Sequence, residues 1–524
     1  MMSRSKRSQN FANYLFAQPA ECKHQYLQFG DTAAIICLVL FSFYVGLTRF
    51  EYLQGEDYGV FLSVFGFVAK GVPLYSGVFD IKDPLFLLTG AVLVKLFGPE
   101  GPFLLDILLF MVAGAMAYKT ACALNFDRFT AVTGSVILLL TLSGGYYGSM
   151  RSTLFATVLV VIAYFVAARG YAVLTGLVIA GVGGFKMPYL MLCLPVILLL
   201  CEQDRTIKVT YRVIFGFLLG CSAIFILLVV RGEFVPYLMM VGENFVYQSV
   251  YMKVLGRTEG MAGHLETIAS TGTSIGTFGF VLIVAVGLGI LIPSRVSRVK
   301  TLALGAISTL VLLFLSISAM WGHHFQVLAL YIWPLGLLLV SSLRTYLTNE
   351  EWLVDLKLFS HQLLAGIVLL LSLSALLLGL NGSRTYFTVK PKVALNQVFN
   401  HKWSVPTEIV ALESAYAKHG GEKSFSRLGA NDDSGFGAFI SDEWHLSCPR
   451  IGQYGHEPEH VVNATLRCVE TMPHYVIASP VFFSLQRSAG SFEKFREDML
   501  LILKQKFNCV PVAGWDHAVV CVRS

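Results

Sequence analysis

The stretch that decides the fold is residues 55–88, "GEDYGVFLSVFGFVAKGVPLYSGVFDIKDPLFLL". It follows an apolar run, residues 32–48, that is long enough to cross a bilayer as a helix. Aromatic and aliphatic residues are interleaved in it with charged ones, which are Glu56, Asp57, Lys70, Asp80, Lys82 and Asp83. This mixture is typical of the zone between lipid and water, so the chain is predicted to leave the membrane here.

The composition predicts a polytopic α-helical membrane protein. Hydrophobic residues make up 55% of the 524, and only 14% are charged, against roughly a quarter in soluble proteins. The mean hydropathy is +0.65. Apolar runs of membrane-crossing length predict about eleven helices. They are residues 32–48, 103–122, 129–146, 153–168, 172–185, 187–201, 213–230, 275–292, 301–319, 325–343 and 363–380.

Residues 84–97 are apolar but short for a span, and two topologies follow from that. If this segment crossed the membrane, the later Lys- and Arg-rich loops would face outward. If it lies along the interface, those loops stay in the cytoplasm with the basic amino terminus. We therefore predict an interfacial helix, an uncleaved cytoplasmic amino terminus and a multi-pass protein of a bacterial-type plasma membrane.

Residues 1–380 are predicted to form the membrane domain, and residues 381–524 a water-soluble α/β domain on the outer side. Residues 474–479 and 517–523 read as buried strands, and residues 491–507 as an amphipathic helix. Four cysteines would then lie in an oxidising compartment, at spacings that favour one or two disulfides over a zinc site. They are Cys448, Cys468, Cys509 and Cys521.

Some classes of function are disfavoured. The chain contains no Walker-type phosphate loop and no GxSxG elbow, which argues against an ATP-driven pump and a serine hydrolase. Its cations are dispersed among loops, which argues against nucleic acid as a partner. A secondary transporter or flippase for a lipid-linked or anionic substrate stays an alternative, but such carriers place ionisable residues near the bilayer midplane.

Here the polar groups gather instead in the connections predicted to face outward. Beyond the first segment, these groups are Arg151, Lys186, His323 and His324. A site built at this face would suit a substrate that is part lipid and part water-soluble.

The sequence resembles the polyprenyl-phosphate-dependent GT-C glycosyltransferases, which include lipid A aminoarabinose transferases and protein O-mannosyltransferases. The resemblance rests on "GEDYGVFL" and "GVPLYSGVFDIKDPLFLLTGAVLVKLFG", and more weakly on "MRSTLFATVLVVIAYFVAARG", "GVGGFKMPYLMLCLPVILLL" and "GHHFQVLALYIWPLGLLL". It covers residues 30 to 345. The chain departs from the family in having Glu-Asp for the commoner Asp-Glu and "KDP" for "KPP".

The resemblance implies an inverting transfer of a sugar from a polyprenyl phosphate to an acceptor hydroxyl. Asp57 is the candidate general base, with Glu56 as the alternative carboxylate. Lys82 would stabilise the departing phosphate, helped by Arg151, Lys186, His323 and His324. Tyr58 and Asp80, with Glu243 and Asn244 of the long loop 231–274, are candidates for contacting substrate.

Structural roles are open for the same residues. Asp57 and Glu56 suit a helix start, Lys82 and Lys70 suit the interface, and Arg151 and Lys186 suit topology anchors. No cofactor besides the lipid-linked donor is expected, and a divalent ion between Asp57, Asp80 and Asp83 is the less favoured option. Membrane lipids are expected partners, together with an acceptor that is a cell-envelope glycan, glycolipid or protein.

Overall fold

The computed structural model describes most of the amino-terminal bundle and of the carboxyl-terminal domain. The residues described are 29–47, 56–144, 150–203, 206–242, nine residues scattered over 327–341, 405–429, 436–450, 459–479, 482, 490–512 and 518–524. The predicted spans 275–292, 301–319 and 363–380 lie outside these residues.

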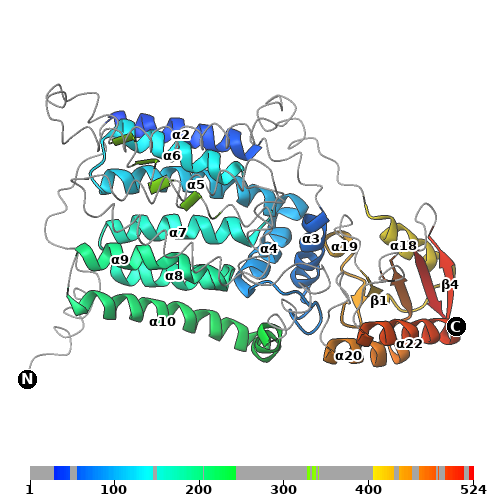
Figure 1. Cartoon of the computed structure of the whole chain (residues 1–524). Helices are drawn as coiled ribbons and strands as arrows, with labels where there is room; N and C mark the ends of the chain where they lie inside the picture. The colour runs from blue at the N-terminus through cyan, green and yellow to red at the C-terminus, as the bar shows by residue number, and fades with distance from the viewer. Residues whose placement is uncertain are drawn as a thin grey trace, which may run out of the picture.

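A bundle of helices running side by side forms one half of the molecule (Figure 1). Three apolar segments are long enough to cross a membrane, namely Gly30–Leu47, Pro84–Ala123 and Ile207–Val230. The predicted spans that fall in the described residues are helical. They are α2 (Phe29–Leu47), α5 (Gly101–Ala123), α6 (Arg128–Gly144), α7 (Ser152–Ala168), α8 (Ala172–Phe185), η3 (Met187–Cys193) with α9 (Leu194–Gln203), and α10 (Ile207–Val230).

Glycine allows one chain reversal and one close helix crossing within this bundle. Gly170 has φ +77°, which any other residue adopts at a cost, and it lets the chain reverse between α7 and α8. Where α8 crosses α10, a Cβ on Gly176 would overlap the carbonyl oxygen of Val213, and one on Gly216 that of Val173. Small residues at such crossings let backbones pack closely where lipid leaves little hydrophobic drive between helices.

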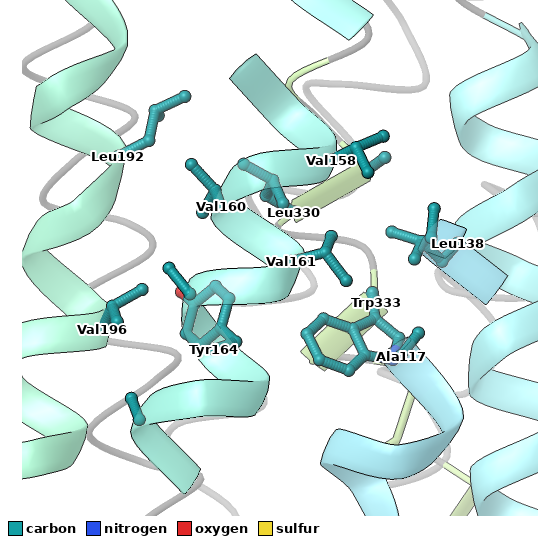
Figure 2. Close-up of a cluster of buried hydrophobic side chains, with 14 of the residues drawn as sticks. Ala117, Leu138, Val158, Val160, Val161, Tyr164, Leu192, Val196, Leu330 and Trp333 are labelled. Carbon is teal, nitrogen blue, oxygen red and sulfur yellow. The ribbon is translucent and has the colours of Figure 1, made fainter. Parts of the chain in front are cut away.

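The bundle core also contains part of the predicted span 325–343. The described residues of this segment pack between α5, α6 and α7, with Trp333 buried against Tyr164 at a ring-centroid distance of 5.8 Å (Figure 2). A Cβ on Gly134 of α6 would overlap the Leu337 side chain. The predicted helix therefore belongs to the same core as the earlier ones.

Two shorter helices, α3 (Glu56–Ala69) and α4 (Pro84–Phe97), lie across one end of the bundle, beside the carboxyl-terminal domain (Figure 1). We call this end the site end. Helix α4 has the bounds predicted for the interfacial helix, and Gly98, at φ +73°, breaks it from α5. The described residues predicted to share a cytoplasmic face lie at the opposite end, which we call the far end.

The carboxyl-terminal domain is an α/β unit, as predicted. Its five-stranded sheet has the order β2-β1-β3-β5-β4. The strands are β1 (Ser424–Leu428), β2 (His445–Leu446), β3 (Tyr475–Ala478), β4 (Phe507–Pro511) and β5 (Val519–Arg523), and the helices are α18 (Thr407–His419), α19 (Phe436–Phe439), α20 (Glu459–Thr471) and α22 (Gly490–Lys506). Strand β1 is parallel to β2 and β3, whereas β5 is antiparallel to β3 and β4.

Two disulfides close this domain, which confirms the prediction from its cysteines. Cys448 is bonded to Cys468 of α20. Cys509 is bonded to Cys521, its partner across β4 and β5. The described cysteines of the bundle are all free thiols. Covalent cross-linking is thus confined, among the described residues, to the domain predicted to meet an oxidising compartment.

Candidate functional site

The loop between α3 and α4, residues 70–83, is folded back on itself at the site end. Tyr75 adopts φ +68° and is buried, and its backbone N–H donates to the carbonyl of Val78 at 2.8 Å. Its hydroxyl donates to the backbone carbonyl of Lys82 at 2.9 Å. Asp80 accepts a hydrogen bond from the backbone N–H of Lys82 at 3.0 Å. Both contacts fix the backbone of Lys82.

Asp83 ends this loop at the position before α4, where Pro84 starts the helix. Its carboxylate joins two further elements. One oxygen accepts a hydrogen bond from the backbone N–H of Met187 at 3.1 Å. The other accepts from the Tyr237 hydroxyl at 3.4 Å. Asp83 therefore ties together the loop, the start of η3 and the helix of residues 234–242.

Three cations from three separate connections come together beside this loop, and two of them, Lys82 and Lys186, act on the Asp83 carboxylate. Lys82 comes from the loop, Arg151 from the position before α7, and Lys186 from the residue after α8. The charges of Lys82, Asp83 and Arg151 all act on the Lys186 ammonium. We call Lys82, Arg151 and Lys186 the basic cluster. Residues far apart in sequence thus bring three cations together, with Asp80 bonded to the Lys82 backbone and Asp106 to the residue before Arg151.

The electrostatics of the cluster reflect its partial burial. Loss of solvent lowers the pKa of Lys186 to about 7, aided by Lys82 and Arg151 and opposed by Asp83. Loss of solvent also raises the pKa of Asp83 to about 6, opposed by the Met187 N–H, Lys186, Tyr237 and Lys82. Both side chains are half-buried. An anion bound beside Lys186 would favour the charged form of its ammonium.

The ammonium groups of Lys82 and Lys186 each lie over an aromatic ring. The Lys82 ammonium lies 5.6 Å from the centroid of the Phe61 ring. The Lys186 ammonium lies 4.8 Å from that of Tyr189. Such contacts stabilise a cation without neutralising it, so both ammonium groups keep their charge available to a ligand.

A second acid, Glu233, contacts the loop near its start. Glu233, only 1% exposed, accepts a hydrogen bond from the backbone N–H of Leu74 at 2.9 Å. It also pairs with Arg231, at 2.7 Å from Nε and 2.8 Å from an η nitrogen. The loop is therefore held at both of its ends by residues beyond α10.

The candidate base belongs to the start of α3. This helix begins at Glu56, which places Asp57 in its first turn, and the side chains of both acids lie outside the described part of the chain. The Tyr58 hydroxyl donates to the carbonyl of Pro99 at 2.8 Å. Burial and then the nearby Asp106 carboxylate raise the Tyr58 pKa well above its usual value.

Asp106 connects this helix start to the basic cluster. Its carboxylate accepts a hydrogen bond from the backbone N–H of Met150 at 2.8 Å, and Met150 directly precedes Arg151. The first turn of α3 and the start of α7 are thus linked through one buried acid.

Among the remaining candidates, Asp80 and Tyr58 both make internal contacts, as described above. The other four, His323, His324, Glu243 and Asn244, lie outside the described residues. Within the described ranges, no three His, Cys, Asp or Glu side chains gather as a metal site requires. The role of a metal stays a prediction.

Several contributors to the site were not singled out from the sequence. Tyr75, Glu233 and Tyr237 went unnoticed, and Asp83 was considered only as a metal ligand. The signal for Asp83 was its place before Pro84 at a helix start. No neighbouring residue indicates a role for Tyr237 or Glu233, because their partners lie about 150 residues away in sequence.

No protein-family model and no curated protein matches the chain.

Proposed function

We propose that this protein is an inverting membrane glycosyltransferase that moves a sugar from a polyprenyl phosphate to a cell-envelope acceptor. The observation that carries the proposal is the basic cluster. Lys82, Arg151 and Lys186 converge from three connections at one end of an apolar bundle. A phosphate joined to an apolar tail could bind there, with its oxygens beside the cations of the basic cluster and its tail against the apolar helices.

The reaction would proceed by direct displacement at the anomeric carbon. Asp57 accepts the proton of the acceptor hydroxyl, whose oxygen forms a bond to that carbon. The bond from the carbon to the phosphate oxygen breaks, and its electron pair leaves with the phosphate. Lys82, Arg151 and Lys186 stabilise the negative charge that develops on that phosphate. Attack from the side opposite the leaving group inverts the configuration.

The arrangement of charges supports an outward-facing site. The described cations that were predicted to stay in the cytoplasm lie at the far end; they are Lys119, Arg128, Arg169, Lys208 and Arg212. Both disulfides lie in the domain beside the site end. We infer about eleven spans, with an amino terminus in the cytoplasm and the domain after residue 380 outside.

The alternative of a secondary transporter receives less support. A carrier would place ionisable residues halfway along its spans. In the described helices α2 and α5 to α10, charged residues lie within the first or last two turns. The charge is concentrated at the helix ends, as a transferase that meets its donor at the membrane surface requires.

A transfer assay tests the proposal. Purified protein in lipid nanodiscs would be given a panel of radiolabelled polyprenyl-phosphate sugars and envelope acceptors. We expect transfer from at least one donor, and a loss of roughly 100- to 10,000-fold in Asp57→Asn, as for removal of a general base. Glu56→Gln serves as the matched control. Undiminished transfer by Asp57→Asn, with loss in Glu56→Gln, would move the base to Glu56, and loss in neither would refute base catalysis by this pair.

A further inference from the structure

The carboxyl-terminal domain is seated directly on α3. Where α19 meets this helix, a Cβ on Gly437 would overlap the carbonyl oxygen of Ser63, and one on Gly66 the backbone of Gly437. The Ser63 hydroxyl accepts a hydrogen bond from the Gly437 N–H at 3.3 Å. The two backbones are therefore packed with no side chain between them.

Buried and charged contacts surround this glycine pair. The fully buried Arg427 reaches Ser63 at 3.5 Å and forms an ion pair with Glu408 at 3.0 Å. At the edge, Lys70 pairs with Asp442 at 2.7 Å. Lys70 was interpreted from the sequence as an interfacial side chain, and in the structure it joins the loop to the domain.

The same domain also pairs with the loop that bears Lys82 and Asp83. The backbone N–H of Arg450 donates to the carbonyl of Gly77 at 2.8 Å. Val78 and Arg450 form an isolated parallel β-bridge. The next loop residue, Phe79, packs against the core of the domain. Only Asp80 and Ile81 lie between Phe79 and Lys82 in the chain, so movement of the domain would displace the basic cluster.

The segment that contacts the loop is itself held in place. Cys448, two residues before Arg450, is bonded to Cys468 of α20. The Thr465 hydroxyl of that helix shares its proton between the carbonyl of Val461 at 2.9 Å and that of Pro449 at 3.3 Å. Residues 448–450 are therefore fixed to α20 and present the Arg450 N–H from a rigid base.

We infer that the carboxyl-terminal domain is a positioning element of the basic cluster, which holds residues 74–83 in place through the Gly77–Arg450 backbone pairing and the Gly66–Gly437 contact. The inference rests on the proposed function in taking the ligand to be a phosphate with an isoprenoid tail. It assigns the domain a part in binding the donor, in addition to any part in selecting the acceptor.

The experiment uses the full chain in nanodiscs and two readouts. One is amide hydrogen exchange of residues 70–83 and of Arg450. The other is the affinity for farnesyl methyl phosphate, a phosphodiester with a short isoprenoid tail. The variant is Gly437→Ala, whose added methyl group has no room. The matched control is Gly181→Ala in α8, where a Cβ would meet only Leu159, at 3.6 Å. Ser63→Ala is the second variant, should Gly437→Ala fail to fold.

We expect exchange in the loop and at Arg450 to rise about 10-fold or more in Gly437→Ala and Kd to rise about 10-fold, with neither changed in Gly181→Ala. In the transfer assay, KM for the donor should rise while kcat changes little. Fast exchange at Arg450 with an unchanged loop and an unchanged Kd would overturn the inference. If Lys82→Met and Lys186→Met bind the probe like the wild type, the phosphate site fails, whereas the exchange data still judge the positioning of the loop.

Discussion

The two ends of the helical bundle use charge in opposite ways. At the far end Arg128 is paired with Asp31 at 2.7 Å, and the Tyr118 hydroxyl donates to the same carboxylate at 2.9 Å. Asp127 accepts hydrogen bonds from Thr130 and so caps the start of α6. Acids there are matched to nearby donors, and these contacts serve to anchor helices.

At the site end Lys82 and Arg151 lie close enough to Lys186 to act on its charge, and burial works against the charge of Lys186. Such an arrangement costs stability unless a ligand compensates it, because like charges that are close together and poorly solvated repel. The comparison indicates that the solvent-exposed Arg128–Asp31 pair anchors helices at the far end, whereas the half-buried lysines of the site end suit the proposed binding of an anion. Four predictions test that distinction.

The largest difference is expected when one cation is removed from each end. Lys186→Met should weaken the binding of farnesyl methyl phosphate by about 10- to 100-fold, since hydrogen bonds between charged groups contribute about 1.5–3 kcal/mol. The matched change at the far end, Arg128→Met, should alter binding less than about 2-fold. Titration of both variants in nanodiscs measures the contrast, and equal losses would erase the distinction between the ends.

The second prediction concerns pH. Because the pKa of Lys186 is lowered to about 7, its ammonium loses its proton as pH rises through that value, and the attraction to an anion falls. Kd should rise several-fold between roughly pH 6 and 8.5. The phosphodiester probe has no second proton near neutrality, so the ligand does not titrate in this range. Lys186→Arg, which stays charged, should lose the part of the slope centred near pH 7 and keep only the part below it that comes from Asp83, whose pKa is raised to about 6. The same slope in this variant would contradict the assignment.

The third prediction uses the acid at the centre of the cluster. Asp83 raises the pKa of Lys186, so Asp83→Asn should lower it further and move the midpoint of the pH profile down by about one unit or more. The same change at the far end, Asp31→Asn, should leave the midpoint in place. Binding of the probe measured across the pH range decides between them. A midpoint unchanged in Asp83→Asn would show that the two groups are not electrostatically coupled.

The smallest effect is expected from the far-end ion pair. The Arg128 and Asp31 side chains are 48% and 26% exposed, and pairs this open to solvent contribute about 1 kcal/mol or less. Arg128→Ala should therefore lower the melting temperature by only a few degrees, measured by intrinsic fluorescence. A drop of 10 °C or more would show that this pair holds the bundle together and does more than mark its topology.

Much of the fold could be predicted because its signals are local. Apolar runs placed the bundle helices within a few residues, and α4 and α8 have the predicted bounds. Strands β3 and β5 and helix α22 were also predicted. Strand β1 was missed, because Arg427 and two serines hide a strand in which all five residues are buried. Glu408 and Ser63 compensate the cost of burying the Arg427 guanidinium, and neither partner is adjacent to it in sequence.

The candidate site was predictable in part for the same reason. Lys82, Arg151 and Lys186 stand out as cations at the ends of apolar helices. That they come together around Lys186 was not visible, since it depends on how α4, α7 and α8 pack. Tyr237 and Glu233 contribute only through contacts with a loop more than 150 residues earlier. The roles of Asp57 and Glu56 stay predictions.

By itself, the sequence determined which segments are apolar enough to form a bundle, where its charged ends fall and which cysteines lie together in one domain. These properties depend on residue type and on spacing along the chain, because each segment's preference for lipid or water is set by its own residues. Only the tertiary structure decided that Lys82 and Arg151 lie near Lys186, and that a domain some 370 residues away supports the loop carrying Lys82. Packing energies fall off within a few ångströms and electrostatic energies weaken with distance, so both depend on distances in space that residue order leaves open.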